Sequence, residues 1–98
     1  MSMKPSELLA DSNRWCKGEV AVNELGLGIN PKSDEAVKWC LVGAANKCIP
    51  DFNEFCKLIE KICEITKQNV PYFNDNPETT HEQMLEVLRK AESLAGIE

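Results

Sequence analysis

Residues 33–48, SDEAVKWCLVGAANKC, decide how the rest of the chain is arranged. Ser33 is a typical helix N-cap, because its hydroxyl can accept a hydrogen bond from a free amide of the first turn. Asp34 and Glu35 follow where the helix dipole favours negative charge. From Ala36 onwards, apolar residues occupy almost every side of such a helix, which requires neighbours on more than one side. The pattern predicts a central helix over residues 33–48.

Gly43-Ala44-Ala45 removes side-chain bulk from nearly a full turn of this expected helix. A glycine inside a helix costs about 1 kcal/mol relative to alanine. We therefore infer that another segment of the chain approaches the helix backbone closely at Gly43. Pro50 cannot continue the helix, so the helix ends within two residues of Cys48.

The segment before the central helix predicts one helix and one hairpin. Pro5 suits a first helical position, and the apolar pattern that follows predicts a helix of about three turns, ending near residues 15–18. Between Gly18 and Pro31 apolar residues alternate with polar residues and glycines. This period of two predicts a short, irregular β-hairpin that turns at Asn23-Glu24.

The segment after the central helix predicts two further helices joined by a loop. A third helix begins at Pro50-Asp51, and its apolar side is expected at three-and-four spacing over Phe52, Phe55, Cys56, Ile59, Ile62, Cys63 and Thr66. Residues 69–77 are rich in turn residues and predict a loop. The last helix starts at Thr79 or Thr80 with capping-box spacing and ends at Gly96.

These elements predict a mainly α fold, a compact bundle of four helices with a short irregular β-hairpin between helices 1 and 2. The chain has 98 residues, which favours a single globular domain over residues 1–98. The net charge of −5 opposes nucleic-acid and anionic-membrane binding, so we expect no nucleic acid and no membrane as partners. No signal peptide or long apolar run is recognisable, so a cytoplasmic location is expected.

The cysteines indicate reduced thiols rather than a disulfide framework. Their number is odd, and most lie within apolar patterns, where a thiol behaves as a small hydrophobic group: Cys16, Cys40, Cys48, Cys56 and Cys63. No Cys-x-x-Cys pair is present, and His81 is the only histidine. The spacing of a structural zinc site is therefore missing, and we expect no metal and no cofactor.

Three segments together resemble a domain family of unknown function from bacterial, notably actinobacterial, genomes and from phages. The segments are Trp15-Cys16-Lys17-Gly18, residues 36–44 (AVKWCLVGA), and Phe73-Asn74-Asp75 followed by residues 80–85 (THEQML). In family members, the segments that these resemble have the forms Trp-Cys-x-Gly, a Trp-Cys-(Ala/Leu)-x-Gly-Ala core, and Trp-Asn-Asp before a helix that starts with Thr-x-x-Glu-Val. Phe73 and Met84 depart from the tryptophan and valine often found there. The resemblance implies a bacterial or phage origin and no particular reaction.

A thiol-dependent hydrolase or transferase is the enzymatic alternative. Cys40 or Cys16 as nucleophile, His81 as base, and Asn74 or Asp75 supply the residue types of a Cys-His-Asn arrangement. Cys40 lies within an apolar stretch, whereas a reactive thiol favours an electropositive, partly exposed position. Core packing is the favoured interpretation for Cys40, and solvation at a helix start is the favoured interpretation for His81.

Binding without catalysis is the main functional hypothesis. Trp15 near the glycine-containing hairpin, together with Phe73, Asn74 and Asp75 in the loop before the last helix, is the candidate binding group. Asn74-Asp75 is also the kind of pair that forms an Asx turn. We expect a small accessory or host-interference module that contacts a protein partner, with a small ligand beneath residues 73–75 as the second kind of partner.

Overall fold

The structure is a computed structural model that describes residues 3–97. Its elements in chain order are α1 (Pro5–Leu8), the 3-10 helix η1 (Ser12–Arg14), β1 (Ala21–Val22), β2 (Lys38–Trp39), α2 (Leu41–Cys48), α3 (Phe52–Thr66), α4 (Val70–Asp75) and α5 (His81–Ala95). The fold is mainly helical with one small antiparallel β pair, as predicted. Across residues 3–97 it has five α-helices, so the prediction of four was wrong in number.

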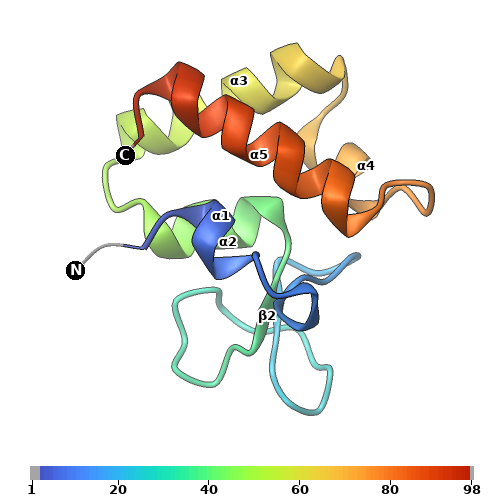
Figure 1. Cartoon of the computed structure of the whole chain (residues 1–98). Helices are drawn as coiled ribbons and strands as arrows, with labels where there is room; N and C mark the ends of the chain where they lie inside the picture. Colours follow the sequence, from blue (N-terminus) through green and yellow to red (C-terminus); the bar gives the residue numbers. More distant parts are fainter. Residues whose placement is uncertain (1–2, 98) are drawn as a thin grey trace.

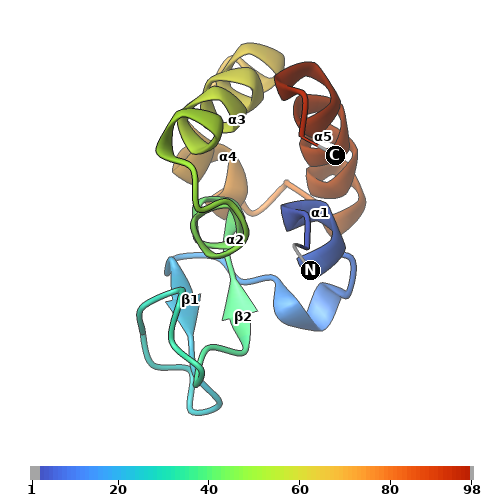
Figure 2. The ribbon, with the colours of Figure 1, turned by 90° about the vertical axis from the view of Figure 1, so that its left-hand side faces the viewer.

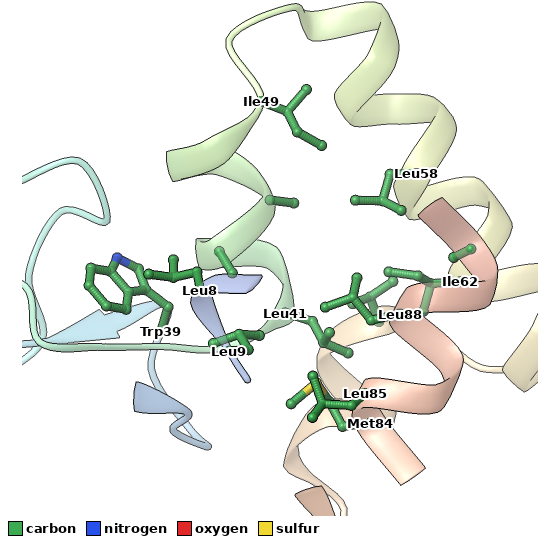
Figure 3. Close-up of a cluster of buried hydrophobic side chains, with 14 of the residues drawn as sticks. Leu8, Leu9, Trp39, Leu41, Ile49, Leu58, Ile62, Met84, Leu85 and Leu88 are labelled. Carbon is green, nitrogen blue, oxygen red and sulfur yellow. The ribbon is translucent and has the colours of Figure 1, made fainter. Parts of the chain in front are cut away.

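The two long helices α3 and α5 lie side by side at one end of the molecule (Figure 1). Figure 2 shows α1 and α2 beneath them, and the strands β1 and β2 beyond α2, on the side away from α3 and α5. The hydrophobic core lies where these helices meet. Figure 3 shows Leu41 of α2 close to Leu88 of α5, with Trp39 at the far end of the cluster beside Leu8.

Local signals define both ends of the long helices. The Asp51 carboxylate accepts hydrogen bonds from the amides of Asn53 and Glu54 at the start of α3. At the start of α5, the Thr80 hydroxyl accepts a hydrogen bond from the amide of Gln83, whose side chain in turn accepts one from the Thr80 amide. The chain leaves α5 at Gly96 in the left-handed conformation, with a φ of 74°. The predicted capping box and C-terminal glycine are confirmed.

The apolar face of α3 differs from the predicted one. Leu58 and Ile62 are fully buried, whereas Phe52 and Cys56 are exposed. Helix α3 packs mainly against α5, and this contact is made by the Leu58 side of the helix. The expected stripe was therefore wrong at its N-terminal end, where Phe52 lies in the first turn beyond that contact.

The central helix begins at Leu41, eight residues later than predicted. Ser33 does cap, but it caps a turn: its hydroxyl accepts a hydrogen bond from the Glu35 amide at 3.1 Å. Residues 37–40 instead extend alongside residues 20–22, with the Val37 amide donating to the Val22 carbonyl and the Cys40 amide to the Val20 carbonyl. Backbone pairing with a distant segment replaces the first two turns of the expected helix.

The β pair also has a partner that the sequence pattern did not indicate. Ala21 lies opposite Trp39 and Val22 opposite Lys38, so β1 pairs with β2 rather than within residues 18–31. The predicted turn at Asn23-Glu24 is present, because the Asn23 amide donates to the Leu27 carbonyl and a single bridge joins Val22 to Gly28. The hairpin prediction was right about the turn and wrong about the main strand pairing.

Two further predicted segments differ from the structure. The first helix ends at Leu8 and is followed by the separate 3-10 turn η1, so the three-turn helix was wrong. Residues 70–75, expected as a loop, form the short helix α4 with Pro71 in its first turn. Helix α4 sets the position of Asn74, which organises the candidate site.

Gly43 allows a close approach, as predicted. A Cβ atom at this position would collide with the backbone carbonyl of Val20. The extended segment before β1 therefore lies directly on the first turn of α2, and only glycine leaves room for it.

Candidate functional site

The Asn74 side chain joins α4 to two other segments of the chain, residues 15–16 and the start of α2. Its Oδ1 accepts hydrogen bonds from the Trp15 indole at 2.7 Å and from the Leu41 amide at 3.0 Å. Its Nδ2 donates to the Cys16 carbonyl at 3.0 Å and to the Asp75 carboxylate at 2.9 Å. The side chain is fully buried. Two donors and two acceptor positions are the whole capacity of a carboxamide, so Asn74 is fully used inside the protein.

Asp75 and Lys17 extend this network to the surface. The Asp75 carboxylate also accepts a hydrogen bond from the Gly18 amide at 2.9 Å. The Lys17 ammonium donates to the carbonyls of Asn76 and Thr79, at 2.7 and 2.9 Å, and lies 5.1 Å from the centre of the Trp15 ring. The segment after η1 is thereby fixed to the end of α4 and to the turn before α5.

The candidate binding group from the sequence thus has one part inside the protein and one part at its surface. Trp15 and Phe73 are half-buried, Asn74 is buried and Asp75 is exposed. Trp15, Asn74 and Asp75 come together, but their polar groups bond to one another and to backbone atoms. Their geometry is that of a structural connection, and partner binding by this group stays a prediction.

Cys40 is the N-cap of α2, where its sulfur accepts a hydrogen bond from the Gly43 amide at 3.3 Å. A helix N-terminus favours the thiolate. Burial has the larger effect in the opposite direction, and it raises the pKa of the Cys40 thiol above its ordinary value of 9.0. The predicted place of Cys40 inside a helix was wrong, whereas its predicted burial is confirmed.

Cys16 and Cys48 are also poor nucleophiles. Burial, with a smaller contribution from Cys40, raises the pKa of the Cys16 thiol to about 11. Burial likewise raises the pKa of the Cys48 thiol to about 11. All five cysteines are free thiols in the structure. At neutral pH the half-buried thiols of Cys16 and Cys48 hold their protons, which is the opposite of what a thiol nucleophile requires.

His81 is half-buried rather than solvated, which corrects the sequence interpretation. Its Nε2 lies 2.6 Å from the Leu9 carbonyl oxygen. Because a carbonyl can only accept, Nε2 carries the proton and donates it to this bond. The ring centre also lies 5.9 Å from that of Trp15. The imidazole therefore connects α5 to the end of α1 through its Nε2.

Metal binding and membrane spanning find no support in the described residues. Within residues 3–97, no group of three or more histidine, cysteine, aspartate or glutamate side chains is arranged to hold a metal ion. Over the same residues, no helix has both the length and the apolar character needed to cross a membrane.

Sequence reasoning missed an exposed apolar surface at the end of the molecule that carries the strands. Leu25 and Leu27 are exposed there, and we call these two residues the loop-tip surface. Leu25 and Leu27 were interpreted only as alternating strand residues. Their position on either side of Gly26, in a turn that Asn23 closes, was the signal that both would face solvent.

The chain was compared with protein families, with curated proteins and with solved structures. A family model described as a family of unknown function, DUF6197, matches residues 5–94. Neither a curated protein nor a solved structure gives a significant match. Any functional statement therefore has to be argued from the geometry of the chain itself.

Proposed function

Because the chain belongs to the family of unknown function DUF6197, which carries no assigned reaction, we propose from its own geometry that it is a protein-interaction module. The loop-tip surface is its contact region. One observation carries this proposal: Leu25 and Leu27 are 82% and 59% exposed on the same short turn. Single exposed leucines are common, but a group of them on one loop is typical of an interaction site.

The turn that presents these leucines is ordered before any partner arrives. The Asn23 carboxamide oxygen accepts hydrogen bonds from the amides of both Leu25 and Leu27, at 2.9 and 3.1 Å. Gly26 between them adopts a φ of 79°, which favours glycine. A preformed loop loses less conformational entropy on binding, which increases affinity.

Charges beside the loop tip define the chemistry of the partner. Glu24, Asp34 and Glu35 line a surface hollow of about 560 Å³ together with Leu25. The whole chain carries a net charge of −5. A partner with an apolar pocket and a basic rim would match both features, and its association would be faster at low salt. An accessory or host-interference role, which fits the small size and acidity of the chain and the missing catalytic signature, is part of the same proposal.

The experiment is a comparison of captured proteins with and without the loop-tip leucines. The immobilised chain, its Leu25→Ser/Leu27→Ser double variant and a control, Leu94→Ser, are exposed to lysate of the source cell. Leu94 of α5 is 55% exposed, so the control removes a similar apolar group from another surface. We expect a basic protein that the native chain and the control retain and that the double variant loses about tenfold. Capture that is equal for all three chains would contradict the proposal.

A further inference from the structure

We propose that a second region, separate from the loop tip, binds a small organic carboxylate with a compact apolar body. The site is a cavity of about 540 Å³ between α1, η1, β2 and the end of α2. Its walls include Leu8 and Trp39 from the core, and Arg14 and Lys47 from the surface. Volumes of this order are typical of pockets for small molecules.

The inner wall of the cavity is apolar. Leu8 and Trp39 lie beside each other at the end of the core cluster (Figure 3). The indole nitrogen of Trp39 donates to the Pro31 carbonyl at 2.9 Å, so its one polar atom already has a partner. Trp39 is 6% exposed and Leu8 3%, so each offers the cavity only a narrow apolar edge, which favours contact with a compact hydrocarbon group.

The outer wall carries positive charge without a balancing carboxylate. Among residues 3–97, Arg14 and Lys47 are the only charged residues that line this cavity. Within residues 3–97 neither makes an ion pair, and the Lys47 ammonium instead lies 5.6 Å from the centre of the Trp39 ring. Two cations beside an apolar pocket, in a chain of net charge −5, form a local exception to the overall charge. An anionic group on the ligand would match them.

The largest of the surface cavities described here carries charges of both signs. The cavity of about 850 Å³ near the ends of α1 and α5 is lined by Lys4 and Arg89, but also by Glu7 and Glu92. Glu92 is buried and already accepts two hydrogen bonds from Ser6, at 2.8 and 2.6 Å. Charges there balance within the protein, whereas at Arg14 and Lys47 they do not.

The guanidinium of Arg14 favours a carboxylate in particular. Its planar donors match the two oxygens of a carboxylate, while the ammonium of Lys47 adds a second positive charge. The ligand we infer therefore places its apolar body against the exposed edges of Trp39 and Leu8, and its carboxylate toward Arg14 and Lys47.

The first experiment is a ¹H,¹⁵N NMR titration with 2-naphthoate and its neutral analogue 2-naphthamide. Trp39 lines the cavity and Trp15 does not, so the two indole N–H signals report the bound position. We expect 2-naphthoate to shift the Trp39 signal and leave the Trp15 signal in place. A ligand of about a dozen heavy atoms should bind with a dissociation constant of about 1 mM or below. The neutral amide should bind at least about fivefold more weakly, because it lacks the charge.

Matched variants separate the two cations from general electrostatics. Arg14→Gln and Lys47→Gln each remove one positive charge from the cavity wall, and Lys57→Gln removes one from the exposed side of α3. We expect the first two to weaken 2-naphthoate binding about threefold to tenfold. The Lys57 control should leave it unchanged. An unchanged Trp15 indole signal in each variant shows that the fold is intact.

Three results would overturn the inference. The first is no shift of the Trp39 signal at 5-fold the expected dissociation constant, about 5 mM. The second is equal binding of the acid and the amide, which would leave only an apolar cleft. The third is equal weakening by the control and the two cavity variants, which would assign the effect to net charge.

Discussion

The α3 and α5 pair and the segment from Trp15 to Cys48 are stabilised in different ways. The long helices have their own caps and bury repeated apolar side chains against each other. Residues 15–48 contain two strands of two residues each, long connections and the short helix α2. The part before α2 is attached to α4 through Asn74, and to α2 through the Val20 carbonyl over Gly43. Local sequence determines the first region, and a few long-range contacts determine the second.

Substitution of Asn74 should show most clearly that a few long-range contacts stabilise residues 15–48. In Asn74→Ala, the Trp15 indole, the Leu41 amide and the Cys16 carbonyl lose their partner inside the protein. Buried groups without partners cost about 1–3 kcal/mol each, so we expect a loss of about 4 kcal/mol in the free energy of unfolding. Native-state hydrogen exchange should accelerate most at the amides of Cys16, Val37 and Cys40.

Leu58→Ala is the matched change in the helix pair. Leu58 is fully buried in α3, and its truncation should cost about 3 kcal/mol. Exchange should then accelerate in α3 and α5 as well as in the strands, because the strands depend on the helices. If Asn74→Ala also accelerated exchange equally in both regions, the two would be one cooperative unit and the distinction would be lost.

A substitution at Gly43 tests the contact between the Val20 carbonyl and the first turn of α2. In Gly43→Ala the new methyl group would meet the Val20 carbonyl, and a backbone atom cannot move aside as a flexible side chain would. We expect a loss of about 2 kcal/mol, although alanine is the better helix former. Urea denaturation measures it, with Asn46→Ala on the same helix as the control. A stabilised Gly43→Ala variant would show that the strand segment is not held tightly against α2.

The same difference explains how much of the structure could be predicted. Thr80, Gln83 and Gly96 specify α5 within a few residues of its ends, so its bounds were available from sequence. Ser33 carried an equally good local signal, yet the helix starts at Leu41 because Val37 and Cys40 pair with residues 20–22. No local pattern contains that pairing.

Prediction of the candidate site from the sequence was limited for the same reason, because its contacts join residues that are far apart in the chain. Asn74 was singled out as an informative polar residue, but three of its four partners lie 33 to 59 residues away in sequence. Its role as a structural connection therefore could not be deduced from the residues beside it. Arg14 and Lys47 meet around one cavity only because η1 and the end of α2 are adjacent in the fold.

The smallest expected difference between the regions is a dependence of stability on pH. Burial raises the pKa of the Cys16 thiol from 9.0 to about 11, so the folded chain keeps a proton that the unfolded chain releases between these pH values. This stabilisation is complete below pH 9 and is lost as the pH rises toward 11.

Cys16 is partly exposed, so its contribution is smaller than the full shift implies, about 1 kcal/mol. We expect Cys16→Ala to reduce by this amount the fall in unfolding free energy between pH 8 and pH 10.5, measured by urea denaturation with a reductant present. Cys56→Ala is the control, because that thiol is exposed on α3. An equal effect of the two substitutions would mean that the Trp15 to Cys48 region is no more sensitive to alkaline pH than the long helices.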